Sequence, residues 1–271
     1  MLLSKIYTTL FLIIFSALIW NCKKIYFRPQ GSNPPTDSAQ SQLAPAKADT
    51  GVCIGNSIIA GHPWRRSGLE LGNLNYPDSF GQISYHLAQL ANFPWYDRGI
   101  GKQTTGDIRK RFLRDAIGLT SDPGDGRGAR TLSGTPSYVV VEGGVNDIDG
   151  HIALSTIEDN LTWMASTCKQ YNVHCIVLNC VGQGNSLFND DQIKMISDLN
   201  KWLAAGALDS TNATVVDINS LWNSGSYQGV SPYGNDNVHY SSLVNEKDGI
   251  HFTQAGYDSV ANVIYRVAKL P

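Results

Sequence analysis

The sequence predicts a three-layer α/β/α domain built on a sheet of five parallel strands. Five short apolar runs alternate with segments in which apolar residues recur every three or four positions, the spacing of a helix with one buried face. The clearest run is Tyr138–Val141, and its unbroken apolar character is typical of a strand buried on both faces. Strands that alternate with helices form βαβ units with right-handed crossovers, so the sheet is expected to be parallel.

Each element is placed by its apolar spacing and its flanking residues. The expected strands are 52–55, 94–96, 138–141, 175–178 and 214–217. The expected helices are 79–90, 105–116, 155–171, 191–205 and a last helix that begins at Thr253. Thr105 is expected to cap the second helix, and Ser155 with Glu158 to form a capping box on the third. The segment 218–248 has no clear period, and loops of this length are often functional, so it is expected to wall a site.

The composition is that of a globular protein with one large domain. Of its 271 residues, 42% are hydrophobic and 16% are charged, which is enough to bury a substantial core. The formal net charge of −2 gives no reason to expect nucleic acid as a partner.

Residues 1–22 have the pattern of a bacterial lipoprotein signal. Lys5 precedes an apolar run, 6–20, and Cys22 follows it as the residue to be lipidated. An ordinary signal peptide and an uncleaved anchor are the alternatives. Residues 23–50 are rich in Pro, Ser, Gln and Ala and are expected to form a flexible tether to a folded domain at 51–271. The protein is therefore expected in the bacterial cell envelope, held at the membrane by a lipid anchor, or secreted if Cys22 is not lipidated.

Four cysteines remain after Cys22. Cys53 lies in a predicted strand and is expected to be a small core residue. Cys168 and Cys175 flank a helix-to-strand turn, and their spacing permits a disulfide without requiring one. No Cys/His grouping, Cys180 included, has the spacing of zinc ligands, so no metal is expected.

Ser57 is the candidate nucleophile, because it follows the first predicted strand on a Gly55-Asn56 turn. In open α/β sheets, ligands bind beside the carboxyl ends of the strands. The serine needs a base, and Asp248 and His251 stand three residues apart before the last helix, where the carboxylate could orient the imidazole. The alternative is that the stretch is only a turn, since all three of its residues favour turns.

Acyl chemistry also needs hydrogen-bond donors aimed at the developing negative oxygen. The side-chain amide of Asn146, after the third strand, is one candidate. A backbone N–H in the Gly101-Lys102 turn, after the second strand, is another, and the Ser57 N–H could be a third. All of these groups lie at predicted strand ends, which favours one shared site.

These stretches resemble the motifs of the bacterial GDSL/SGNH hydrolase family, from Ile54 to His251. Gly55-Asn56-Ser57-Ile58 stands where the family has Gly-Asp-Ser-Leu. Gly144-Val145-Asn146-Asp147 matches its Gly-x-Asn-Asp motif, and Asp248-Gly249-Ile250-His251 matches Asp-x-x-His. The resemblance implies a flavodoxin-like sheet, a triad of Ser57, His251 and Asp248, and an oxyanion hole that includes Asn146. It also implies ester or thioester hydrolysis through an acyl-serine, with no metal or cofactor.

Two residues depart from the family pattern. Asn56 replaces the usual aspartate, so Asn56→Asp is expected to preserve or raise activity if Ser57 is the nucleophile. Lys102 stands where the family has its oxyanion glycine, so either Lys102 or Gly101 would supply the backbone N–H.

The sequence thus predicts a serine esterase that acts on a lipid or an acetylated carbohydrate, either a small molecule or a polysaccharide. A catalytically weak surface lipoprotein that binds a glycan or acyl ligand is the alternative, because Asn56 and Lys102 are unusual. Acyl transfer to another alcohol is a third possibility.

Overall fold

The computed structural model describes residues 48–64, 82–119, 132, 134–182, 188–223, 242–245 and 249–271. All of them belong to one compact unit, which spans residues 43–271. The predicted signal 1–22, with Cys22, and residues 23–47 of the predicted tether lie outside the described residues. Within the described ranges, no helix is both long enough and apolar enough to cross a membrane.

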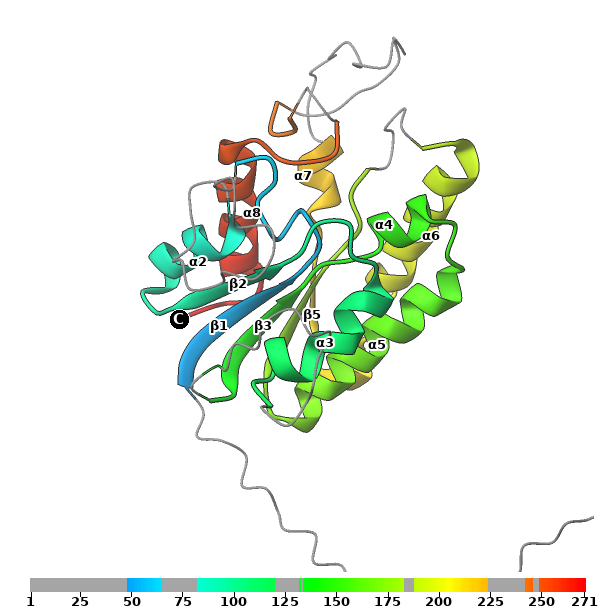
Figure 1. Ribbon diagram of the computed structural model, residues 1–271. Coiled ribbons are helices and arrows are strands. Elements are labelled where there is room, and N and C mark those ends of the chain that lie inside the picture. Colours follow the sequence, from blue (N-terminus) through cyan, green and yellow to red (C-terminus); the bar gives the residue numbers. More distant parts are fainter. Residues whose placement is uncertain are drawn as a thin grey trace, which may run out of the picture. The chain divides into compact units, whose positions relative to one another are not determined.

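The sheet has five parallel strands in the order β2-β1-β3-β4-β5 (Figure 1). The strands are β1 (Ala48–Gly55), β2 (Trp95–Gly99), β3 (Pro136–Val141), β4 (His174–Leu178) and β5 (Thr214–Val216). The prediction of a five-stranded parallel sheet is therefore confirmed. β1 begins earlier than expected, because Ala48 already pairs with Pro136 of β3 before a register shift at Gly51.

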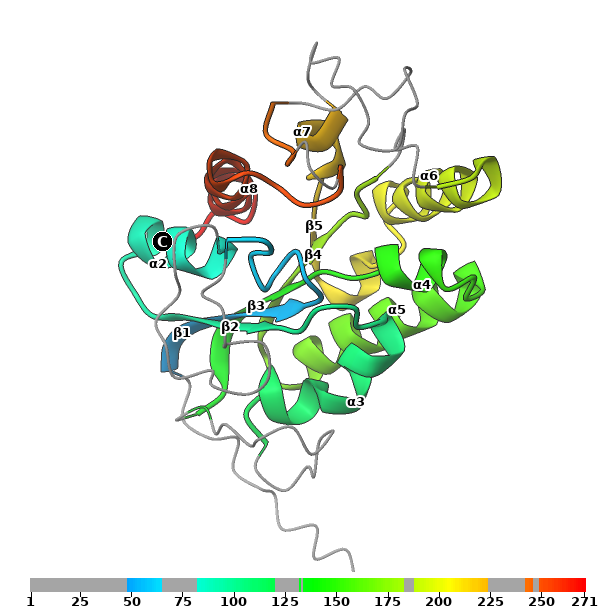
Figure 2. The ribbon, with the colours of Figure 1, turned by 45° about the horizontal axis from the view of Figure 1, so that its top comes forward.

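Helices cover both faces of the sheet, as the predicted three-layer arrangement requires. The helices are α2 (Ile83–Ala91), α3 (Thr105–Asp115), α4 (Val145–Asp149), α5 (Leu154–Gln170), α6 (Asp190–Ala204), α7 (Asn219–Asn223) and α8 (Gln254–Val267), with a 3₁₀ turn at Asp209–Thr211. Figure 2 shows α2 and α8 packed together on one face, with α3, α5 and α6 on the other. The short helices α4 and α7 follow strands directly and were not predicted.

Two predicted helix caps are wrong. Thr104, not Thr105, caps α3: its hydroxyl accepts from the Asp107 N–H, and the Asp107 carboxylate accepts from the Thr104 N–H. Ser155 lies inside α5, whose N-cap is Ala153 and has no side-chain cap bond. The Thr105 hydroxyl is used elsewhere, because it donates to the buried carboxylate of Asp147.

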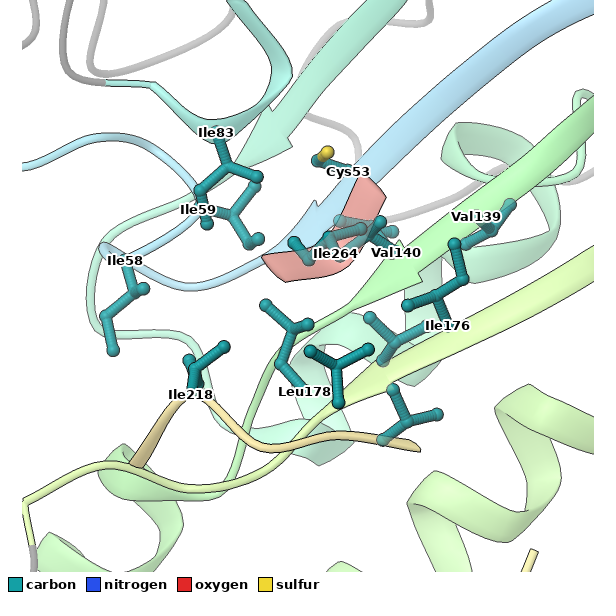
Figure 3. Packing of buried hydrophobic residues seen from close by; sticks show 14 of the residues in the cluster. Cys53, Ile58, Ile59, Ile83, Val139, Val140, Ile176, Leu178, Ile218 and Ile264 are labelled. Carbon is teal, nitrogen blue, oxygen red and sulfur yellow. The ribbon is translucent and has the colours of Figure 1, made fainter. Parts of the chain in front are cut away.

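The core joins the strands to the helices on both faces of the sheet, and Figure 3 shows part of it. Val139 and Val140 of β3 lie in the same cluster as Ile264 of α8. Ile58 and Ile59, the two residues after Ser57, are also fully buried in it. Because burying an aliphatic side chain contributes about 1.5–3 kcal/mol, these two isoleucines anchor the turn that carries Ser57.

Cys53, Cys168, Cys175 and Cys180 are buried, and none of them forms a disulfide. Cys53 lies within the core, as predicted. Cys168 and Cys175 are not joined by a disulfide, although they are close enough for Cys175, together with burial, to raise the pKa of the Cys168 thiol.

Candidate active site

Ser57 lies on a tight turn that closes directly after β1. The Asn56 side chain accepts from the Ile58 N–H at 2.9 Å, and the Asn56 carbonyl accepts from the Ala60 N–H at 3.1 Å. A methyl group on Gly55 would stand 2.6 Å from Cγ1 of Ile59 and 2.7 Å from the Glu142 carbonyl oxygen. Only glycine fits where the turn folds back this closely against β3, so the local geometry requires Gly55.

Ser57 and His251 meet at hydrogen-bond distance. Nε2 of His251 is 2.8 Å from Oγ of Ser57, although 194 positions separate the two residues in sequence. Both side chains are half-buried, so a small molecule can reach them. This is the contact that a base needs in order to take the serine proton.

The backbone holds His251 in place just before α8. Val244 and Phe252 form an isolated antiparallel bridge, and the His251 carbonyl accepts from the Asn245 N–H at 2.7 Å. Thr253 then caps α8 through its hydroxyl, which accepts from the Gly256 N–H. The imidazole is therefore fixed by a paired segment and a helix start.

Asp248, the predicted partner of His251, lies outside the described residues, so its role stays a prediction. The structure brings a second histidine to the site: the rings of His62 and His251 have centroids 4.6 Å apart. Trp64 follows on the same loop, with its indole N–H donating to the Phe252 carbonyl at 3.0 Å and its side chain 40% exposed. A partly exposed aromatic ring is thus anchored to the residue that follows His251.

The predicted oxyanion donors lie on the loop after β2 and on α4, which are hydrogen-bonded to each other. A methyl group on Gly101 would stand 3.9 Å from Cβ of Ser57, so this loop passes beside the nucleophile. Nδ2 of Asn146 donates to the Gln103 carbonyl at 2.9 Å, and the same nitrogen carries a second N–H. The structure therefore brings Gly101 and Asn146 to one region beside Ser57.

Asp147 fastens the start of α3 to α4. Its buried carboxylate accepts from the Thr105 N–H at 2.8 Å and from the Thr105 hydroxyl at 2.6 Å. Burial raises the pKa of Asp147, and these hydrogen bonds oppose the shift. Since Asn146 and Asp147 both reach the 103–105 segment, the Gly-Val-Asn-Asp stretch fixes the neighbouring loop as well as supplying an amide.

Lys102 adopts the left-handed conformation, with φ of 65°, and Gly101 does not. A left-handed residue other than glycine costs about 1 kcal/mol or more. The Lys102 side chain is exposed, so the strain lies only in the Lys102 backbone.

Arg111 is a buried residue beneath the site that sequence reasoning missed. Its guanidinium donates to the backbone carbonyls of Gly55 and Arg98, at 3.1 and 2.8 Å, which lie near the ends of β1 and β2. It also donates to Oε1 of Gln103 at 2.7 Å and to Asp115 at 3.2 Å. Its position three residues after Ile108, on the apolar face of α3, was the available signal.

The described residues contain no group of three or more His, Cys, Asp or Glu side chains that could hold a metal ion. The site is a serine–histidine pair beside backbone and amide donors, an arrangement that is suited to acyl transfer.

The sequence pattern of the GDSL-like lipase/acylhydrolase family matches residues 53–258. The chain belongs to this family. The resemblance inferred from the sequence is therefore confirmed, and the GDSL-family chain is a hydrolase. No curated protein matches it in sequence.

Solved structures of an acetylxylan esterase and of a GDSL-like lipase share the fold. An acetylxylan esterase from Geobacillus stearothermophilus is 16% identical, with a TM-score of 0.57 over 83% of this chain and 96% of that one. A GDSL-like lipase from Bacteroides thetaiotaomicron is 20% identical, with a TM-score of 0.56 over 82% of this chain and 88% of that one. Catalytic mutants of the Geobacillus esterase replace a serine or a histidine with alanine.

Proposed function

We propose that the chain is a carboxylic ester hydrolase that works through an acyl-serine intermediate. The observation that carries the proposal is the 2.8 Å contact between Oγ of Ser57 and Nε2 of His251. Family membership and the catalytic serine and histidine mutants of the acetylxylan esterase support it.

In the first half-reaction, Nε2 of His251 takes the Ser57 proton while Oγ attacks the ester carbonyl. The negative charge on the carbonyl oxygen is held by the Asn146 amide and by a backbone N–H at Gly101 or Lys102. The left-handed backbone of Lys102 favours Lys102 as the counterpart of the family glycine. The tetrahedral species then collapses, and the imidazolium protonates the departing alcohol.

In the second half-reaction, His251 deprotonates a water molecule that attacks the acyl-serine. Collapse of this second tetrahedral species returns the proton to Ser57 and releases the carboxylic acid. Asp248 would hold the imidazole tautomer and stabilise the imidazolium in both halves.

An acetylated carbohydrate is the substrate class that we favour over a lipid. Trp64 presents a partly exposed ring, and its bond to the carbonyl of Phe252, the residue after His251, fixes that ring in place. A fixed indole suits the flat face of a sugar. The structural similarity to an acetylxylan esterase also favours an acetylated carbohydrate. Because the fold is also similar to that of a GDSL-like lipase, a lipid ester is the alternative substrate to test.

The test is fluorophosphonate labelling combined with a panel of esters that vary in acyl length and in leaving group. We expect the wild-type protein to be labelled and to hydrolyse short acyl esters, and Ser57→Ala to lose both activities. Ser259→Ala is the matched control, because the Ser259 hydroxyl bonds to the Ala255 carbonyl of its own helix. A folded wild-type protein that is neither labelled nor active, yet binds a glycan, would instead support a binding role.

We also propose that the protein is anchored outside the cytoplasm by a lipid on Cys22. The support is the charged and apolar pattern that precedes Cys22 in the sequence. In a bacterial host, radiolabelled palmitate should enter the wild-type chain and not Cys22→Ala. Equal labelling of both chains, or of neither, would contradict the anchor.

A further inference from the structure

Asn56, the residue that departs from the family motif, is bonded at both ends of its side chain. Its Nδ2 donates to Oε1 of Glu142 at 3.2 Å, and its Oδ1 accepts from the Ile58 N–H at 2.9 Å. Asn56 is fully buried, and Glu142 is only 1% exposed. The amide therefore bridges the end of β3 to the turn on which Ser57 lies, and an ionised aspartate could not donate to Glu142 in its place.

We propose that Glu142 is a positioning residue for Ser57, acting through the Asn56 amide. The proposal rests on the ester hydrolase function proposed above. Glu142 follows β3 directly, and its own N–H donates to the Ile54 carbonyl of β1 at 3.1 Å, so its backbone is fixed in the sheet. It can therefore hold the Asn56 side chain, and through it the turn, against a rigid frame.

The buried environment of the Glu142 carboxyl favours its neutral form. Burial raises its pKa to about 8, the nearby Asp147 charge adds to the rise, and the Asn56 hydrogen bonds oppose it. Among the described residues, Oε2 of Glu142 is buried without a hydrogen-bond partner, as suits a carboxyl that carries no charge. Burial raises the pKa of the Cys180 thiol, and the nearby Glu142 and Asp147 carboxyl groups, once ionised, add to the rise.

The only cation that the described contacts bring to this turn is Arg111, and it donates to the Gly55 carbonyl rather than to Glu142. Nothing in these contacts therefore offsets a second carboxylate here. Asn56→Asp would place a second acid about 3 Å from Glu142, so the two acids would share one proton and carry one buried negative charge beside the turn that holds Ser57. Glu142 thus explains why this chain has Asn56, and it reverses the expectation that Asn56→Asp preserves activity.

The test is a set of four variants assayed for kcat and KM on a short acyl ester. Asn56→Asp should lower kcat by about tenfold or more with little change in KM, because Ser57 is displaced from His251. Glu142→Met, which removes the acceptor, should do the same. Glu142→Gln keeps the acceptor and should stay within about threefold of wild type. The double variant Asn56→Asp/Glu142→Gln restores a donor–acceptor pair and should recover most of the loss from Asn56→Asp.

A second readout is the pH dependence of thermal stability. Folded Glu142 keeps its proton up to about pH 8, whereas the unfolded residue loses it near its ordinary value of 4.5. The wild-type protein should therefore lose stability relative to Glu142→Gln as pH rises from about 4.5 to 8, with no further change above that. Asp159→Asn, at an exposed position on α5, is the control and should show no such widening gap in Tm.

The outcomes separate this inference from the proposed function. A wild-type protein without esterase activity would overturn both. An active wild-type protein whose Asn56→Asp variant is equally active, or whose double variant is no better than Asn56→Asp, would overturn the positioning role alone. If the difference in Tm between wild type and Glu142→Gln did not grow with pH, Glu142 would be charged in the folded protein. That result would overturn the inference that its carboxyl is neutral.

Discussion

Replacing His251 with asparagine is expected to lower kcat/KM for an activated ester by about a thousandfold or more while leaving the protein folded. Asparagine can still accept a hydrogen bond from Ser57, but it cannot take a proton at neutral pH. The 2.8 Å contact between Nε2 and Oγ would then be lost as a route for the proton. Steady-state kinetics and the thermal unfolding curve of the purified variant measure the two parts of this prediction.

His151→Asn is the matched control for this variant. His151 is exposed and has φ of 56°, a conformation that asparagine tolerates well. Its kcat/KM should stay within about twofold of wild type, as for most surface substitutions. If His251→Asn retained a tenth or more of the activity, another base would have to act. His62 would then be the residue to replace next, because its ring lies 4.6 Å from that of His251.

The sequence predicted the parallel sheet because each strand is a distinct apolar run bounded by turn residues. The same logic placed Ser57 and Asn146 after strands, where the structure also has them, since both strands are apolar enough to be recognised. His251 was found because it stands three residues after Asp248 and just before a clear helical pattern. The contact between Ser57 and His251 follows from topology, because α8 packs on the face that α2 covers, near the end of β1.

Contacts between polar groups that are distant in sequence could not be predicted in this way. Glu142 lies 86 positions from Asn56, and no periodicity links them. The α3 cap was missed because two threonines are adjacent, and only the partner of Thr105, Asp147, determines which one is left to cap the helix. Apolar patterns define which face is buried, but they do not say which polar groups are satisfied there.

Arg111 is a buried polar residue of this kind. We expect Arg111→Met to lower the free energy of unfolding by about 3 kcal/mol or more. Methionine fills a similar volume but removes every donor from a fully buried position. The Gln103 and Asp115 side chains would each lose a hydrogen bond, and so would the carbonyls of Gly55 and Arg98. Chemical denaturation monitored by tryptophan fluorescence gives the free energy.

Two further variants test whether the loss of stability in Arg111→Met comes from the loss of the guanidinium hydrogen-bond donors. Lys110→Met removes a positive charge from the next position, where the side chain is 70% exposed, and should change stability by no more than about 0.5 kcal/mol. Arg111→Lys keeps the charge but cannot reach all four acceptors, so its stability should fall between wild type and Arg111→Met. Because Arg111 also holds Gln103, whose carbonyl accepts from Asn146, the folded fraction of Arg111→Lys should show a lower kcat as well. If Arg111→Met were as stable as Lys110→Met, the guanidinium would not be what joins the ends of β1 and β2 to α3.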